Sequence, residues 1–347
     1  MRIHTSAAAI VFAVVAAACS APVAPACAPC ACADGPKKDA TTTAGITSLD
    51  VGVLVFDIGV TDTAQLFHIA DQVTAWNPFA HKQYARWLDA THAIGPTEQS
   101  ALDAHRTLRK RLGYGVIDQT FYTARTIDAA LATTSLAAAD VETERVFLRT
   151  MSPLIMPIVE REHANVVALR DAIVARRDTL SSMLADLASF AEVYIAKEHV
   201  PLWLIATTDP ANGGGGYNGG QMTVEASRGA TELLMHESLH FVLHHRSDVL
   251  SDAARACGAG LDKMTLEEGI AYALYPGIVG PTNAIRHELE RLAREAKPVD
   301  DPFVRFNRLG LALTPVLEKA LVNKTKLTTL LPEACAAYKR IAAETWP

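Results

Sequence analysis

The stretch His236-Glu237-Ser238-Leu239-His240 contains two histidines four residues apart, with a glutamate directly after the first one. On an α-helix, residues with this spacing lie one turn apart on the same face, so both imidazole rings can reach a single metal ion. Apolar residues cover the opposite side of such a helix, namely Leu234, Met235, Leu239, Phe241 and Val242. The pattern predicts a helix over residues 229–245 with metal ligands on one face and core on the rest.

A neutral imidazole is a good ligand for Zn²⁺, and a site with three protein ligands leaves a fourth position open for water. Glu237 follows His236 by about 100° around the helix axis, where its carboxylate can touch that water without binding the metal itself. We therefore expect Zn²⁺ as the cofactor, His236 and His240 as ligands, and Glu237 as the general base. The third ligand has to come from another part of the chain.

The segment TLEEGIAY, residues 265–272, offers this ligand, and its Glu268 follows the second histidine by 28 residues. Together the two motifs resemble those of the gluzincins, the zinc peptidases that include thermolysin and the membrane-alanyl-type aminopeptidases. In that group a glutamate on a second helix completes the site, commonly within N-E-G-x-A. The resemblance implies that Glu268 is the third ligand, because Gly269 and Ala271 match the small residues that follow it. Glu267 stands in place of the asparagine and is the alternative ligand, since adjacent helical residues diverge by about 100° and only one can face the metal.

The resemblance also implies a hydrogen-bond donor for the oxyanion that forms during peptide hydrolysis. In the aminopeptidases this donor is a tyrosine well downstream of the third ligand, and Tyr338 lies at a comparable distance. Tyr272 and Tyr275 are further candidates for the role, and Tyr217 and His287 are alternatives.

Two more expectations follow from the resemblance. Thermolysin-like proteins carry an aspartate four residues after the third ligand, which orients a zinc-bound histidine. Tyr272 stands at that position here, so Asp248 and Asp252 are candidates to replace the aspartate. The strand-like residues Gln221–Ala226, directly before the metal-binding helix, fit the edge strand on which gluzincins lay an extended substrate.

The remaining pattern predicts an α+β fold that is mainly helical with a small β-sheet. Amphipathic stretches follow one another over residues 49–198 and indicate a helical N-terminal domain without a catalytic motif. Residues 199–347, with strand-like runs at Pro201–Thr207 and Gln221–Ala226, are expected to form a zincin-like catalytic domain. The glycine-rich residues 212–220 match no phosphate-binding motif, and we interpret them as a flexible loop beside a substrate groove.

The N-terminus has the features of a bacterial export signal. Arg2 precedes the apolar run Ala7–Ala18, which is too short to span a bilayer. The run ends in Ala16-Ala17-Ala18-Cys19, which resembles the lipobox, in which the cysteine is lipidated and becomes the mature N-terminus. Because Ala16 stands where the lipobox most often has leucine, an ordinary signal peptidase site is the alternative.

We therefore expect residues 1–18 to be a signal peptide and Cys19 to be lipidated. Residues 19–48, which are low in complexity, are expected to form a disordered tether. The protein is then exported and held at the cell envelope by its lipid, or else secreted.

The six cysteines fall into two groups besides Cys19. Cys27, Cys30 and Cys32 lie in the tether, and we interpret their C-x-x-C spacing as a result of the biased composition. Cys257 and Cys335 are the cysteines of the globular part, where they form either a disulfide or two buried thiols.

The formal net charge is −6, and no run of Lys and Arg stands out, which argues against nucleic acid as a partner. We expect a peptide or protein substrate, and contact with the membrane only through the lipid anchor. The predicted function is hydrolysis of peptide bonds by a zinc-activated water with Glu237 as base. The alternative is a zinc-binding envelope lipoprotein with a structural or binding role and no turnover.

Overall fold

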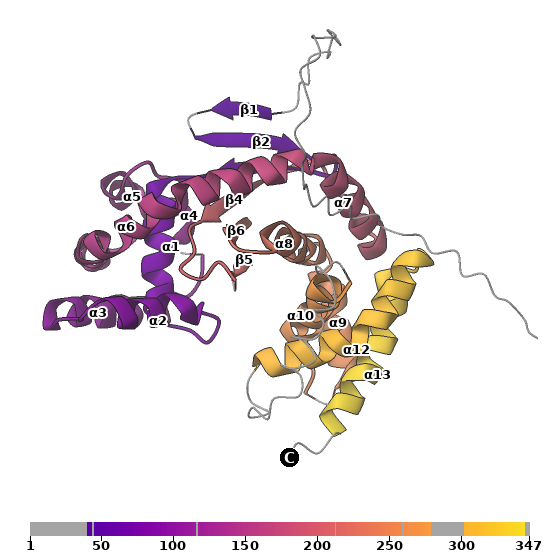
Figure 1. Ribbon diagram of the computed structural model, residues 1–347. Helices are drawn as coiled ribbons and strands as arrows, with labels where there is room; N and C mark the ends of the chain where they lie inside the picture. The colour runs from indigo at the N-terminus through magenta and orange to yellow at the C-terminus, as the bar shows by residue number, and fades with distance from the viewer. Residues whose placement is uncertain are drawn as a thin grey trace, which may run out of the picture. The chain divides into compact units, whose positions relative to one another are not determined.

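The fold is organised around a six-stranded mixed β-sheet with strand order β1-β2-β3-β4-β6-β5 (Figure 1). Strands β1, β2 and β3 are antiparallel, β3, β4 and β6 run parallel, and β5 is antiparallel to β6. Parallel strands covered on both faces are apolar throughout, as the sequence of β4 is from its third residue onward. The strands are β1 (Ala40–Thr43), β2 (Ile46–Asp50), β3 (Leu54–Gly59), β4 (Glu198–Ile205), β5 (Gly215–Asn218) and β6 (Gln221–Glu225).

The computed structural model describes residues 40–43, 45–115, 117–211, 213–258, 260–278 and 302–343. These residues belong to one unit, which begins at Asp39. The predicted signal peptide, Cys19, the three cysteines of the tether and His287 lie outside the described residues. Within the described ranges, no helix is both long enough and apolar enough to cross a membrane.

Helices make up most of the described chain, which confirms the prediction of a mainly helical protein with a small sheet. The helices between β3 and β4 are α1 (Asp62–Val73), α2 (Lys82–Thr91), α3 (Pro96–Leu112), α4 (Asp118–Thr123), α5 (Ile127–Thr133), α6 (Ala138–Ala175) and α7 (Arg177–Ala191). Those after the sheet are α8 (Ala230–His244), α9 (Ser247–Cys257), α10 (Lys263–Tyr272), the π-helical turn η1 (Ala273–Ile278), α12 (Pro302–Val322) and α13 (Leu327–Ala343).

The sheet joins the two halves of the chain. Strand β4 begins at Glu198 and pairs with β3, which precedes all the helices of the first half. The predicted domain boundary between residues 198 and 199 therefore falls inside a strand of the shared sheet.

Strands form in two places where the sequence indicated none. Ala40–Thr43 and Ile46–Asp50 pair with each other within or next to the predicted tether, so ordered structure begins before residue 48. In the glycine-rich segment, Gly215–Asn218 pairs with Gln221–Glu225 as a hairpin, which corrects the prediction of an irregular loop. Its two turn residues, Gly219 and Gly220, have φ of 59° and 81°, a region that favours glycine.

The prediction that Gln221–Ala226 forms an edge strand is wrong, because β5 pairs with β6. Strand β6 has β4 on one side and β5 on the other, so the edge of the sheet near α8 is β5.

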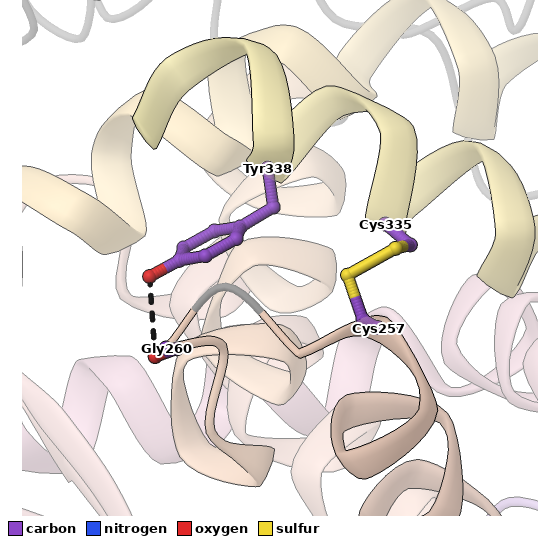
Figure 2. The surroundings of a disulfide bond; sticks show 4 residues. All are labelled: Cys257, Gly260, Cys335 and Tyr338. Carbon is purple, nitrogen blue, oxygen red and sulfur yellow. Dashed lines mark hydrogen bonds between the residues drawn. A yellow bond between two sulfur atoms is a disulfide. The ribbon is translucent and has the colours of Figure 1, made fainter. Parts of the chain in front are cut away.

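A disulfide joins Cys257, at the end of α9, to Cys335 on α13 (Figure 2). The two Cα atoms are 5.6 Å apart, and 78 residues separate the cysteines in the sequence. One turn further along α13, the hydroxyl of Tyr338 donates a hydrogen bond to the carbonyl oxygen of Gly260 at 3.3 Å. Both contacts fasten α13 to the connection between α9 and α10.

A network of buried charged side chains connects the helices of the first half. Asp71 on α1 lies 2.8 Å from Nε of Arg109 and 2.9 Å from Nε2 of His105, both on α3. Arg109 also contacts Asp118 on α4 at 2.7 Å, and His105 contacts Glu144 on α6 at 2.8 Å. Burial raises the pKa of Asp71, but Arg109 and His105 lower it by more, to about 2. Buried charges of this kind are stable only while each is paired.

We predict that Asp71→Asn lowers the free energy of unfolding by about 3 kcal/mol at pH 7, because Arg109 loses one of its two buried partners. Because the pKa of the Asp71 carboxyl is about 2 in the fold and 3.8 ordinarily, the ionised form stabilises the fold above pH 4. The difference between wild type and variant should therefore stay constant from pH 7 to 5 and shrink as the pH falls from about 4 toward 2. Urea unfolding over this pH range measures it.

Asp103→Asn provides the matched control, since Asp103 pairs with Arg106 on the exposed side of α3. Its cost should stay under about 1 kcal/mol. Equal losses for the two variants would mean that the buried network does not stabilise the fold.

Candidate metal centre

Helix α8 carries the two histidines of the first motif on one buried face. His236 and His240 are 7% and 8% exposed, and their Nε2 atoms lie 3.1 Å apart. The helix begins after Gly229, and it packs against β5, β6, α7, α10 and η1. Its apolar residues fill these contacts, so the histidines point to the side where α10 approaches.

Helix α10 brings Glu268 to this face. The Asp262 side chain accepts a hydrogen bond from the backbone nitrogen of Thr265 at 2.7 Å and thereby caps the start of the helix. The Oε2 atom of Glu268 lies 3.7 Å from Nε2 of His236 and 3.5 Å from Nε2 of His240. On a neighbouring face, α10 meets α12 closely, because a Cβ at Gly269 would come within 2.5 Å of Leu309. The glycine after Glu268 is therefore required for packing.

The spacing of the three ligand atoms fits a zinc ion. Ligands about 2.1 Å from a tetrahedral zinc lie about 3.4 Å from one another, and the observed separations are 3.1 to 3.7 Å. Burial by itself lowers the pKa of His240, but Glu268 and Glu267 raise it well above its usual range. The site thus favours a positive charge at the point where the three side chains meet.

The outer nitrogen of each histidine has its own acceptor. Nδ1 of His236 donates to the carbonyl oxygen of Tyr275 at 3.1 Å, and Nδ1 of His240 donates to Oε1 of Glu267 at 3.0 Å. These acceptors keep the proton on Nδ1 and direct the Nε2 lone pairs toward Glu268. Of the two adjacent glutamates, Glu268 thus faces both histidines, and Glu267 orients one of them.

Glu267 occupies the orienting role for which Asp248 and Asp252 were the predicted candidates. Its second carboxylate oxygen lies 3.5 Å from the Lys263 ammonium group. Asp252 contacts Arg255 on the exposed side of α9 at 2.9 Å, and Asp248 lies in the first turn of that helix.

The carbonyl of Tyr275 was not predicted, because backbone groups leave little trace in a sequence. The signal that could have found it is Pro276, since a residue before proline avoids helical backbone angles. Tyr275 indeed has φ −133° and ψ 126° within η1. Its carbonyl therefore leaves the helical hydrogen-bond pattern and can accept from His236.

Glu237 lies between the histidines and the sheet edge. It is 4% exposed, and a Cβ at Gly215 of β5 would come within 2.8 Å of its Oε1 atom. Burial raises the pKa of Glu237, and this effect outweighs the two neighbouring histidines, which lower it. A buried carboxylate with a raised pKa is suited to accept and return a proton.

Tyr272 is the candidate donor that the structure brings to the cluster. Its ring lies 5.2 Å from that of His236, perpendicular to it. Burial raises the pKa of its hydroxyl, and Glu268 and Glu237 raise it further. Gly310 of α12 leaves room for this tyrosine, because a Cβ there would come within 2.5 Å of the Cβ of Tyr272.

The other candidate tyrosines have different surroundings. The Tyr275 hydroxyl lies 2.8 Å from where a Cβ of Gly229 would be, at the start of α8. Burial and, to a smaller extent, the negative charge of Glu232 raise the pKa of this hydroxyl to about 12. Tyr217 on β5 lies beside the rings of Phe241 and His244, further along α8. Tyr338 holds the Gly260 loop next to the disulfide, so its hydroxyl has a structural partner instead of a place among the ligands (Figure 2).

A second group that could hold a metal ion consists of His68, His81 and Glu225. No local motif in the sequence marks this group, because Glu225 is 144 residues from His81 in the chain. Nδ1 of His81 contacts Oε1 of Glu225 directly, and Nε2 of His68 lies 3.7 Å from the same oxygen. The other oxygen of Glu225 accepts from Gln83 at 2.7 Å and from the backbone of Gly214 at 2.8 Å. A carboxylate with these direct donors is a hydrogen-bond acceptor, so the first group fits a metal better.

No protein-family model matches the chain, and no curated protein or solved structure matches it either.

The adjacent glutamates make a matched pair for testing the ligand assignment. Glu268→Gln should weaken zinc binding by more than 100-fold, because it removes a charged ligand atom. Glu267→Gln should weaken it only about 10-fold, because it alters the partner of a ligand. Competition with a chromogenic chelator measures both affinities. The reverse order would make Glu267 the ligand.

Proposed function

We propose that the protein is a zinc-dependent peptidase of the gluzincin type. His236, His240 and Glu268 are its metal ligands in this proposal. The observation that carries it is that the two sequence motifs meet, with ligand atoms 3.1 to 3.7 Å apart. The carboxylate next to the first ligand in sequence, Glu237, lies between this point and the sheet edge. Structural zinc sites are closed by four ligands, whereas three ligands leave a position for chemistry.

A bound zinc ion would polarise the carbonyl of the peptide bond and acidify the attacking water. Glu237 accepts one proton from this water and then delivers it to the nitrogen of the departing amine, so the base is regenerated. Tyr272, beside His236, donates a hydrogen bond to the developing oxyanion. Glu267 and the Tyr275 carbonyl keep both histidines oriented throughout.

Strand β5 offers a binding surface for an extended substrate. It is the edge of the sheet, it packs against α8, and its first residue touches Glu237. A peptide that pairs with this edge would pass alongside the general base. Backbone pairing provides affinity with little dependence on side chains, which suits a peptidase for varied protein segments.

The proposed location is the cell envelope, reached by the predicted export signal and held by a lipid on Cys19. The disulfide between Cys257 and Cys335 supports it, because disulfides persist in oxidising compartments outside the cytoplasm. Secretion in soluble form is the alternative if Cys19 is not lipidated.

Glu237→Gln tests the function directly. The purified wild type should cleave casein or a mixed fluorogenic peptide library, and a zinc chelator should abolish the cleavage. The variant should bind zinc with unchanged stoichiometry and lose about 1,000-fold in kcat, because the amide cannot take up a proton.

Glu232→Gln is the matched control on the same helix, since Glu232 contacts Arg176 at 2.8 Å near the start of α8. Its kcat should equal that of the wild type. Full zinc binding by the wild type without any cleavage would favour the alternative of a zinc-binding envelope protein. Cleavage that survives Glu237→Gln would exclude Glu237 as the base.

A further inference from the structure

The buried carboxylate of Glu225, the last residue of β6, accepts hydrogen bonds from three donors. Its side chain is 1% exposed. His81 and Gln83, at the start of α2, both donate to it, and the backbone nitrogen of Gly214 donates at 2.8 Å. The backbone nitrogen of Glu225 in turn donates to the carbonyl oxygen of Gly214 at 2.9 Å. Gly214 is therefore held on both its backbone polar groups by one residue.

The ring of His81 lies directly against Gly214. A Cβ at this glycine would come within 2.1 Å of Cε1 of His81 and 2.5 Å of Nε2. The next residue, Gly215, makes the close approach to Glu237. Two consecutive glycines at the start of β5 thus contact the His81–Glu225 pair and the proposed base Glu237, respectively.

The chain around His81 is also held by contacts to α1 and α12. The His81 backbone nitrogen donates to the Gln72 side chain at 2.8 Å. Two residues earlier, the ring of Phe79 packs at 5.4 Å from Phe303 and 6.4 Å from Phe306, both on α12. Helix α12 packs against α10, which carries Glu268. Residues 79–83 therefore connect the start of β5 to α12, and through α12 to α10.

We propose that His81, acting through Glu225 and Gly214, is a positioning residue that sets the free edge of β5 relative to the metal centre and thereby determines how an extended peptide binds. The inference rests on the proposed function, in which β5 receives the substrate. Metal binding is not part of this role, because the ligands come from α8 and α10. Burial lowers the pKa of His81, but Glu225 raises it by more, which strengthens the charge-assisted bond between them.

Two zinc-binding compounds separate an effect on β5 from an effect on the metal. Acetohydroxamate binds the metal alone, whereas a peptide hydroxamate also has to pair with the strand. In zinc-loaded His81→Ala, acetohydroxamate should bind with unchanged affinity, and the peptide hydroxamate should bind roughly 10- to 100-fold more weakly. Calorimetric titration measures both without requiring turnover.

Conservative variants identify the atom responsible. The amide nitrogen of asparagine can occupy the position of Nδ1, so His81→Asn should restore most of the peptide affinity. Glutamine places its amide nearer the position of Nε2, so His81→Gln should not. His199→Ala is the matched control, because His199 lies on the exposed face of β4 beside Asp57.

The contact with Gly214 is tested by a double variant. Gly214→Ala should weaken the peptide hydroxamate, because the added methyl group collides with the imidazole. The pair His81→Ala and Gly214→Ala together should bind no more weakly than His81→Ala alone, since the ring that causes the collision is gone.

Three results would overturn the inference. These are unchanged peptide affinity in His81→Ala, equal loss for both hydroxamates, and a second zinc equivalent that disappears in His81→Ala. Failure of the proposed function is distinct from all three, because it is seen in the wild type itself, which would then either bind no zinc or bind zinc without cleaving any peptide.

Discussion

The fold brings three electron-rich atoms together in a buried place. Two imidazole nitrogens and one carboxylate oxygen lie 3.1 to 3.7 Å apart, and the outer nitrogen of each imidazole already donates its proton elsewhere. In a low-dielectric interior these atoms are stabilised by a positive charge among them, carried either by a protonated His240 or by a bound cation. The fold holds this arrangement through the Tyr275 carbonyl and the Glu267 carboxylate. A divalent metal is the cation whose size and ligand preference fit best.

Glycines allow the surrounding elements to approach this point. Gly269 lets α10 meet α12, and Gly310 leaves room for Tyr272. Gly214 and Gly215 allow the sheet edge to touch His81 and Glu237. At each position a Cβ would come within 3 Å of a neighbouring atom, so a larger residue would force the elements apart. The glycine-rich segment that resembles a flexible loop in the sequence is, in its second half, an ordered strand next to the proposed base.

Local patterns made part of the site predictable from sequence. The helix of His236 and His240 follows from a four-residue spacing, and Glu268 was distinguished from its neighbour only by a motif. Contacts between distant segments could not be predicted in the same way. His81 and Glu225 are 144 residues apart in the chain and carry no local signature. Strand β6 appeared to be an edge in the sequence because its partner β5 is rich in glycine and pairs through backbone groups, which leave no side-chain pattern. The position of Tyr338 near the disulfide depends on how α13 packs, which the sequence does not reveal.

X-ray absorption at the zinc edge of the purified protein tests the central claim most directly, because it reports both the number of imidazoles and the distances of the nearest atoms. We expect one zinc per chain with two imidazole nitrogens and two oxygens, one from Glu268 and one from water, at about 2.0 to 2.2 Å. A spectrum with sulfur ligands, or with three or more imidazoles, would contradict it. So would a protein that retains no zinc.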